Sequence, residues 1–146
     1  MVDQKDKWIK VIAKLIKKTQ EKEIEWEINR SPKNITLDDD AYVEAVFVSS
    51  YKDNRYLRLY KKHFKSIKYV DPIGTLTGVS AGNIFGQKQK ESYWINRIHL
   101  EIVDSNNNIL FEFPSKQSLL NDLLNSVKYQ VSGVSDLIYD LLNEDE

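Results

Sequence analysis

Apolar and polar residues alternate most regularly over residues 93–113, whose sequence is YWINRIHLEIVDSNNNILFEF. Side chains along a strand point to its two faces in turn, so this alternation predicts two strands that share an apolar face. Residues 104–108 (DSNNN) separate the two runs, and Asn and Asp tolerate the left-handed backbone that a tight turn requires. We therefore expect a central β-hairpin. Its predicted core residues are Trp94, Ile98, Leu100, Ile102, Ile109, Phe111 and Phe113.

The pattern before this hairpin predicts one helix followed by three strands. Over residues 5–20, apolar residues recur at spacings of three and four, as in an amphipathic helix. The apolar face of this helix contains Trp8, Ile12, Leu15, Ile16 and Thr19. Residues 23–28 then alternate, with Ile24, Trp26 and Ile28 on one face and Glu23, Glu25 and Glu27 on the other. Further strands are expected over residues 42–51 and 56–64, with a turn between them and with Leu57 and Leu59 in the core.

Two helices are expected after the hairpin. Pro114 ends the sheet, and either Ser115 or Ser118 is a candidate N-cap for the first helix. Gly133 fits the left-handed position that ends a helix, and Ser135 is a candidate cap for the last one. The predicted buried residues are Leu119, Leu120, Leu123, Leu124, Val127 and Val131 in the first helix, and Leu137, Ile138, Leu141 and Leu142 in the second.

These elements predict a single α+β domain over residues 1–146. It has an N-terminal helix, an antiparallel sheet of about five strands, and two C-terminal helices, with the helices packed on one sheet face. A chain of 146 residues can bury such a core without covalent cross-links. No apolar run approaches the length of a membrane span, and the N-terminal segment is too charged for a signal peptide, so we expect a cytoplasmic protein.

The composition favours no metal, no cofactor and no catalytic residue. The chain has no cysteine and two histidines, His63 and His99, neither of which has a nucleophile at motif spacing. Asp38, Asp39 and Asp40 are adjacent, whereas calcium loops place their ligands at alternate positions and add a Gly and a distal Glu. A non-enzymatic role is therefore favoured, and an enzyme built around His99 is a remote alternative.

A basic and aromatic strand is the first candidate binding surface. Residues 52–68 contain seven Lys or Arg residues and one acid, although the whole chain has 21 basic and 22 acidic residues. If Leu57 and Leu59 face the core, the opposite face is expected to expose Tyr56, Arg58, Tyr60 and Lys62. Exposed Tyr and Arg anchor protein interfaces, and the same residue types hold single-stranded nucleic acid. A purely structural alternative is that the Glu23, Glu25 and Glu27 stripe pairs with these cations across the sheet.

A glycine-rich segment is the second candidate. Residues 71–92 contain four of the five glycines, and a connection of this length is often functional or mobile. Backbone N–H groups and a lysine could hold a phosphate there, although the GKS/T ending of a P-loop is missing and a simple connector is the alternative. The candidate residues are Gly74, Thr75, Thr77, Gly78, Asn83 and Lys88.

Three stretches of the chain resemble small bacterial proteins of uncharacterised function that share a helix, a β-meander and a helical tail. They are KLIKKTQEKEIEWE, HLEIVDSNNNILFEFP and LLNDLLNSVKYQVSGVSDLIYDLLNE. The resemblance carries no active site across. It implies an accessory protein of bacteria or mobile elements, with a role in immunity or phage conflict.

Two functional hypotheses follow from the sequence. The first is a non-enzymatic module that binds another protein or a second copy of itself. The alternative is a protein that binds nucleic acid or a nucleotide through the basic strand and the glycine-rich segment. No membrane partner is expected.

Overall fold

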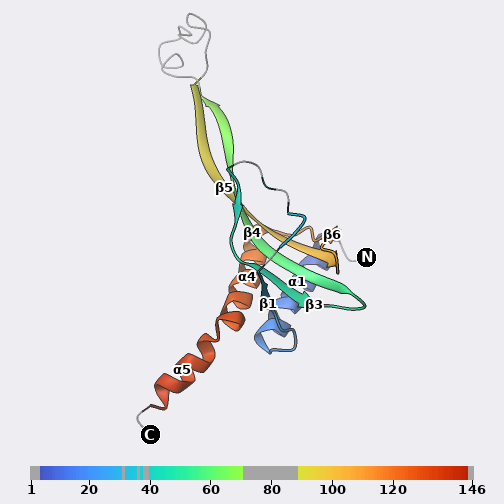
Figure 1. Ribbon diagram of the computed structural model, residues 1–146, viewed down its shortest axis with the longest axis vertical. Helices are drawn as coiled ribbons and strands as arrows, with labels where there is room; N and C mark the ends of the chain where they lie inside the picture. Colours follow the sequence, from blue (N-terminus) through green and yellow to red (C-terminus); the bar gives the residue numbers. More distant parts are fainter. Residues whose placement is uncertain (1–3, 31, 36, 38–39, 71–88, 145–146) are drawn as a thin grey trace, which may run out of the picture.

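The computed structural model describes residues 4–30, 32–35, 37, 40–70 and 89–144, and it has the predicted α+β fold (Figure 1). No helix in these ranges is long and apolar enough to cross a membrane. The elements, in chain order, are α1 (Gln4–Gln20), β1 (Glu27–Asn29), β2 (Tyr42–Val43), β3 (Val46–Ser50), β4 (Arg55–Val70), β5 (Gln89–Asp104), β6 (Ile109–Glu112), α4 (Gln117–Ser132) and α5 (Val134–Leu142).

The sheet is antiparallel, with the strand order β1-β3-β4-β5-β6, and β2 pairs with β4 beyond β3. Strands β4 and β5 pair along their whole length, from Arg55 opposite Asp104 to Val70 opposite Gln89. Their far ends project from the body of the molecule as a two-stranded arm (Figure 1). We call residues 61–70 and 89–98 the β4–β5 arm. The strands are therefore longer than predicted, and the weakly patterned segment of 71–92 already contains the start of β5.

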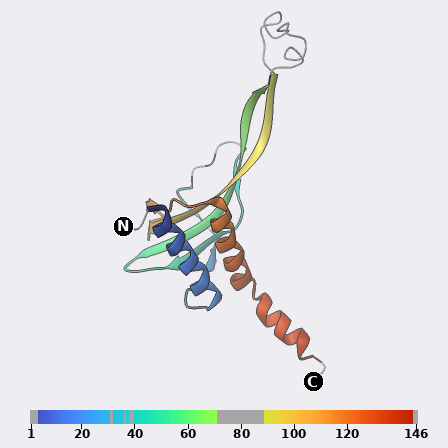
Figure 2. The ribbon, with the colours of Figure 1, turned by 180° about the vertical axis from the view of Figure 1, so that it is seen from behind.

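Helices α1 and α4 lie side by side over one face of the sheet (Figure 2). The predicted apolar stripes of both helices are confirmed, because Ile12 of α1 and Leu123 and Val127 of α4 are completely buried. Leu59 and Leu100 are register partners on β4 and β5 and are also completely buried. The core therefore lies between the two helices and the three central strands. Its other buried members are Trp26, Phe47, Leu57, Ile98, Leu120 and Leu124.

The chain between α1 and β1 differs from the prediction because the side chain of Gln130 in α4 forms hydrogen bonds with its backbone. The Gln130 amide nitrogen donates to the carbonyl oxygens of Thr19 (2.9 Å) and Ile24 (2.7 Å). Its oxygen accepts the Trp26 N–H at 2.7 Å. These groups are then not available to a sheet, so the strand expected over residues 23–28 begins only at Glu27. Trp26 is buried as predicted, whereas Ile28 is exposed and its expected place in the core is wrong.

The predicted hairpin of β5 and β6 is confirmed. Asn107 in its turn has φ 64°, and the Asp104 carboxylate accepts the N–H groups of Asn108 and Asn106, each at 2.9 Å. Hydrogen bonds to its carboxylate hold the pKa of Asp104 below its usual value, and those donated by Asn108 have the largest effect. The core assignments are correct for Ile98 and Leu100 and wrong for three residues that are exposed. These exposed residues are Trp94, Ile109 and Phe111.

The end of the chain departs most from the prediction. Gly133 has φ 68° and ends α4, as expected, but α4 begins after Lys116 without a side-chain cap from Ser115 or Ser118. Helix α5 extends beyond the sheet, away from α1 (Figures 1 and 2). Its apolar side chains were expected to be buried and are instead between 44% and 77% exposed, and α5 has no buried residue. The residues concerned are Leu137, Ile138, Leu141 and Leu142.

Candidate functional site

A buried ion pair joins the two central strands on the sheet face opposite the helices. Arg58 of β4 and Glu101 of β5 are register partners, and both are almost fully buried, at 0% and 2% exposed. Arg58 Nε donates to Glu101 Oε1 at 2.9 Å, and Nη2 lies 2.9 Å from the same oxygen without the alignment of a hydrogen bond. Arg58 Nη1 donates to the Lys33 carbonyl oxygen at 2.6 Å. A charge buried this deeply requires such partners.

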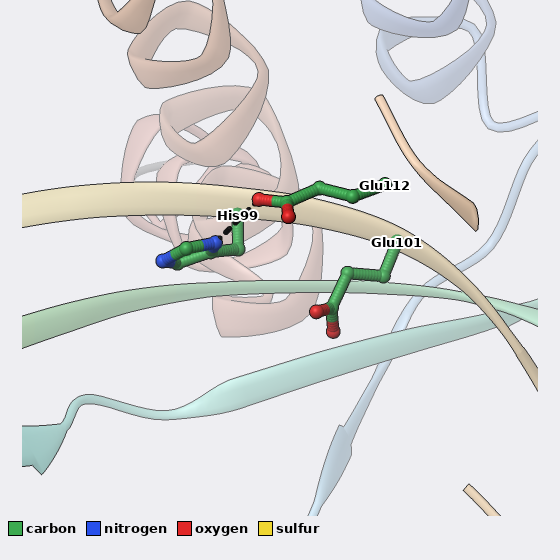
Figure 3. A group of neighbouring side chains, drawn as sticks. All are labelled: His99, Glu101 and Glu112. Atoms are coloured by element: carbon green, nitrogen blue, oxygen red, sulfur yellow. Dashed lines mark hydrogen bonds and ion pairs between the residues drawn. The ribbon is translucent and has the colours of Figure 1, made fainter. Parts of the chain in front are cut away.

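Tyr60, His99 and Glu112 extend this pair into a network. The Tyr60 hydroxyl donates to Glu101 Oε2 at 3.1 Å, and its ring stacks on His99 with centroids 5.1 Å apart. His99 Nδ1 lies 2.6 Å from Glu112 Oε1 (Figure 3). Burial raises the pKa of the Tyr60 phenol, and the nearby Glu101 charge raises it further, so Tyr60 remains a neutral donor.

Each side chain of the network already has a partner within it, which favours a structural role. One ligand atom each from His99, Glu101 and Glu112 lies within 4.8 Å of the others, close enough to surround a cation. However, Glu101 already accepts hydrogen bonds from Arg58 and Tyr60. A metal cation at this place would either displace the Arg58 guanidinium or be repelled by its positive charge. The absence of a metal and of catalytic residues stays a prediction.

The expected exposure of the basic strand is wrong at its centre. Arg58 and Tyr60 face away from Leu57 and Leu59, as alternation requires, but both are buried, and Tyr56 and Lys62 are half-buried. Lys33, before β3, contacts Arg58, and Tyr60 stacks on His99 of β5. The expected Glu23, Glu25 and Glu27 partners are also wrong, since Glu101 on β5 fills that role and β1 pairs with β3. The glycine-rich candidates Gly74, Thr75, Thr77, Gly78, Asn83 and Lys88 lie outside the described residues.

An apolar groove of about 790 Å³ runs beside α1, and no residue of α4 lines it. Its lining comes from α1, from the end of β3 and from the central strands. The apolar members are Trp8, Val11, Leu15, Ile24, Tyr51, Leu57, Ile102 and Phe113. Lys10, Lys14 and Lys18 of α1 also line it. The sequence already contains this row of lysines, but only the fold shows that an open apolar surface lies beside it.

Exposed aromatic and basic side chains gather on the β4–β5 arm. Trp94 is 52% exposed, and the ammonium group of Lys65, its register partner, lies 5.3 Å from its ring centroid. Tyr42 of β2 meets the edge of Trp94 at 5.6 Å and stacks on His63. The arm carries six Lys or Arg residues and one acid, Glu91. The exposed basic and aromatic side chains predicted for this strand are thus found on the arm, beyond the buried Arg58 and Tyr60.

No protein-family model, curated protein or solved structure matches this chain. The functional assignment of the candidate surfaces is therefore based on the geometry of this chain alone.

Proposed function

We propose that this chain is a non-enzymatic protein-interaction module and that α5 carries its main contact surface. The observation behind this proposal is the exposed apolar side of α5, where Leu137, Leu141 and Leu142 are each more than half exposed. Contiguous apolar patches on a protein surface commonly mark sites of protein or membrane contact. The five acidic residues of α5 and of the sequence after it would be repelled by an anionic membrane, which favours a protein partner.

Helix α5 has the form of a helix that docks in a groove. Its apolar residues recur at spacings of three and four, so they form one stripe that a partner can cover. Burying one leucine side chain contributes about 1.5–3 kcal/mol relative to leaving it exposed. A partner that covers this stripe would recover free energy that the chain does not gain from its own fold.

Photo-crosslinking in the native host tests this surface. A photoreactive phenylalanine analogue in place of Leu141 should give a covalent protein adduct, because Leu141 is 59% exposed on α5. The matched control has the same analogue in place of Leu110, which is 52% exposed on β6. We expect an adduct from position 141 that Leu137→Ser weakens and no equivalent adduct from position 110. Equal labelling from both positions, or none from α5, would contradict the proposal.

Nucleic-acid binding by the β4–β5 arm is the second candidate function. It is supported by the exposed Trp94 beside Lys65 and by the excess of basic residues along the arm. Aromatic rings stack on bases and cations contact phosphates, and a two-stranded ribbon also fits the major groove of DNA.

A salt-dependent titration tests this candidate. Labelled single-stranded RNA and DNA should bind the parent at low salt, and affinity should fall steeply as salt rises, because phosphate contacts release counterions. Lys65→Glu/Lys68→Glu should abolish binding, whereas the control Lys17→Glu/Lys116→Glu, with the same charge change at exposed sites elsewhere, should retain it. No binding by the parent at low salt, or equal loss in both variants, would reject the candidate.

A further inference from the structure

We propose that α5 of one copy docks in the groove beside α1 of a second copy, and that the two copies exchange these helices in a reciprocal dimer. This inference rests on the proposed function, because it names the partner of α5 as the chain itself. Two unpartnered surfaces of the same molecule carry it. One is the apolar stripe of α5, and the other is the groove lined by Val11, Leu15 and Phe113.

The two surfaces match in length. The groove follows α1 from Trp8 to Lys18, and ten residue steps along a helix cover about 15 Å. Helix α5 has nine residues, and the steps between them cover about 12 Å. One α5 therefore covers most of the groove.

The two surfaces also match in charge. Lys10, Lys14 and Lys18 line the groove at intervals of four residues, so they form one row along α1. Acidic residues recur at the same intervals in α5 and in the turn that follows it. They are Asp136, Asp140 and Glu144. Opposite charges in two rows of equal spacing can pair along their whole length, which favours a basic groove as the place where α5 docks.

The sequence fixes the orientation of the docked helix. In α1, Lys10 and Lys14 directly precede the apolar groove residues Val11 and Leu15. In α5, Asp136 and Asp140 likewise precede the apolar residues Leu137 and Leu141. The charged rows thus lie on the same side of their apolar stripes. With both stripes facing the sheet, the rows face each other only if α5 runs antiparallel to α1.

Antiparallel docking places Asp140 at the centre, opposite Lys14. Lys10 then lies opposite Glu144, and Lys18 opposite Asp136. Lys18 is 3.7 Å from Glu23 in the single chain, and both side chains are solvated, so this contact gives way at little cost. The central pair is therefore the one to reverse in an experiment.

A chain cannot place its own α5 in its own groove. Only Gly133 joins α4 to α5, and α4 packs beside α1, where Gln20 contacts Ser126. No α4 residue lines the groove, which lies on the other side of α1, so α5 would have to cross over α1 to reach it. A second copy has no such barrier. When each copy gives its α5 to the other, the assembly closes as a two-fold dimer.

Charge reversal followed by mixing tests the proposal. In sedimentation equilibrium, the parent should approach twice the 17.1 kDa mass of one chain as its concentration rises. Asp140→Lys alone and Lys14→Glu alone should each raise the dimer Kd about tenfold, because each places like charges at both exchanged contacts. An equimolar mixture of the two variants should recover the parent Kd, because every contact in the mixed dimer again joins opposite charges.

Matched controls and a stronger variant sharpen the test. Asp122→Lys on α4 and Lys17→Glu on α1 make the same charge changes at exposed sites away from both surfaces, and should leave the Kd unchanged. Leu137→Ser/Leu141→Ser should abolish the dimer while keeping the parent's circular dichroism, since both leucines are exposed.

A parent that remains monomeric at millimolar concentration, or a mixture that fails to recover the parent Kd, would overturn the exchange. The crosslinking experiment separates this result from the proposed function. An adduct of α5 with a different protein and no dimer would keep the interaction module and reject self-association. No adduct and no dimer would reject both.

Discussion

Replacing Arg58 with Met is expected to destabilise the folded protein by about 3–5 kcal/mol. The substitution removes the guanidinium but leaves the Glu101 carboxylate, which is 2% exposed, without its cation. It also leaves the Lys33 carbonyl oxygen without the donor that now lies 2.6 Å away. Met fills much of the same volume, so the loss comes from the unpaired charge rather than from a cavity. Urea unfolding at neutral pH, followed by tryptophan fluorescence, measures the change.

Two controls identify the cause of this loss. Arg55→Met makes the same chemical change on the same strand at an exposed site and should alter stability by less than about 0.5 kcal/mol. Arg58→Met/Glu101→Leu removes both charges and should recover most of the lost stability. The attraction within a buried ion pair is largely offset by the free energy needed to remove both charges from water. If the double variant were less stable than Arg58→Met, the ion pair would not be the source of the effect.

Alternation predicted the direction of each side chain on β4 but not what covers it. Leu57 and Leu59 lie in the core as expected, and Arg58 and Tyr60 point to the other face. The Lys33 carbonyl contacts Arg58, and the Tyr60 ring stacks on His99. A strand pattern gives two faces, and only the tertiary structure decides whether the polar face meets water.

The last two helices illustrate the same limit. Helix α4 and helix α5 both have an apolar stripe, and the sequence predicted burial for both. Leu123 is completely buried because α4 lies over the sheet, whereas Leu142 is 77% exposed because α5 lies beyond it. Periodicity shows that a helix has a side suited to burial. It does not show whether that side packs within the chain or on a partner.

The candidate surfaces were visible in the sequence only in part. The acidic row of α5 and the lysine row of α1 can be counted directly, but the groove needs Tyr51 and Phe113, which come from distant parts of the chain. The hydrogen bonds of Gln130 to the chain between α1 and β1 have no sequence signal. An isolated glutamine on a helix gives no indication of the backbone that it contacts.

Replacing Leu100 with Ala is expected to cost about 2–5 kcal/mol and to lower the midpoint of thermal unfolding by roughly 5–15 °C. Leu100 is completely buried on β5, opposite Leu59 and among residues of α1 and α4. Its carbonyl oxygen also accepts the Phe113 N–H at 2.9 Å, where the chain leaves β6. The smaller side chain loses apolar contacts and leaves a cavity that the surrounding strands and helices cannot fill.

Leu110→Ala is the matched control, because Leu110 is 52% exposed on the adjoining strand β6 and loses the same atoms. We expect it to change stability by less than about 0.5 kcal/mol. Calorimetry of both variants compares the two sites directly. The difference between the two losses of stability measures the contribution of packing α1 and α4 against the central hairpin. An unchanged midpoint for Leu100→Ala would show that the hairpin is not central to the core.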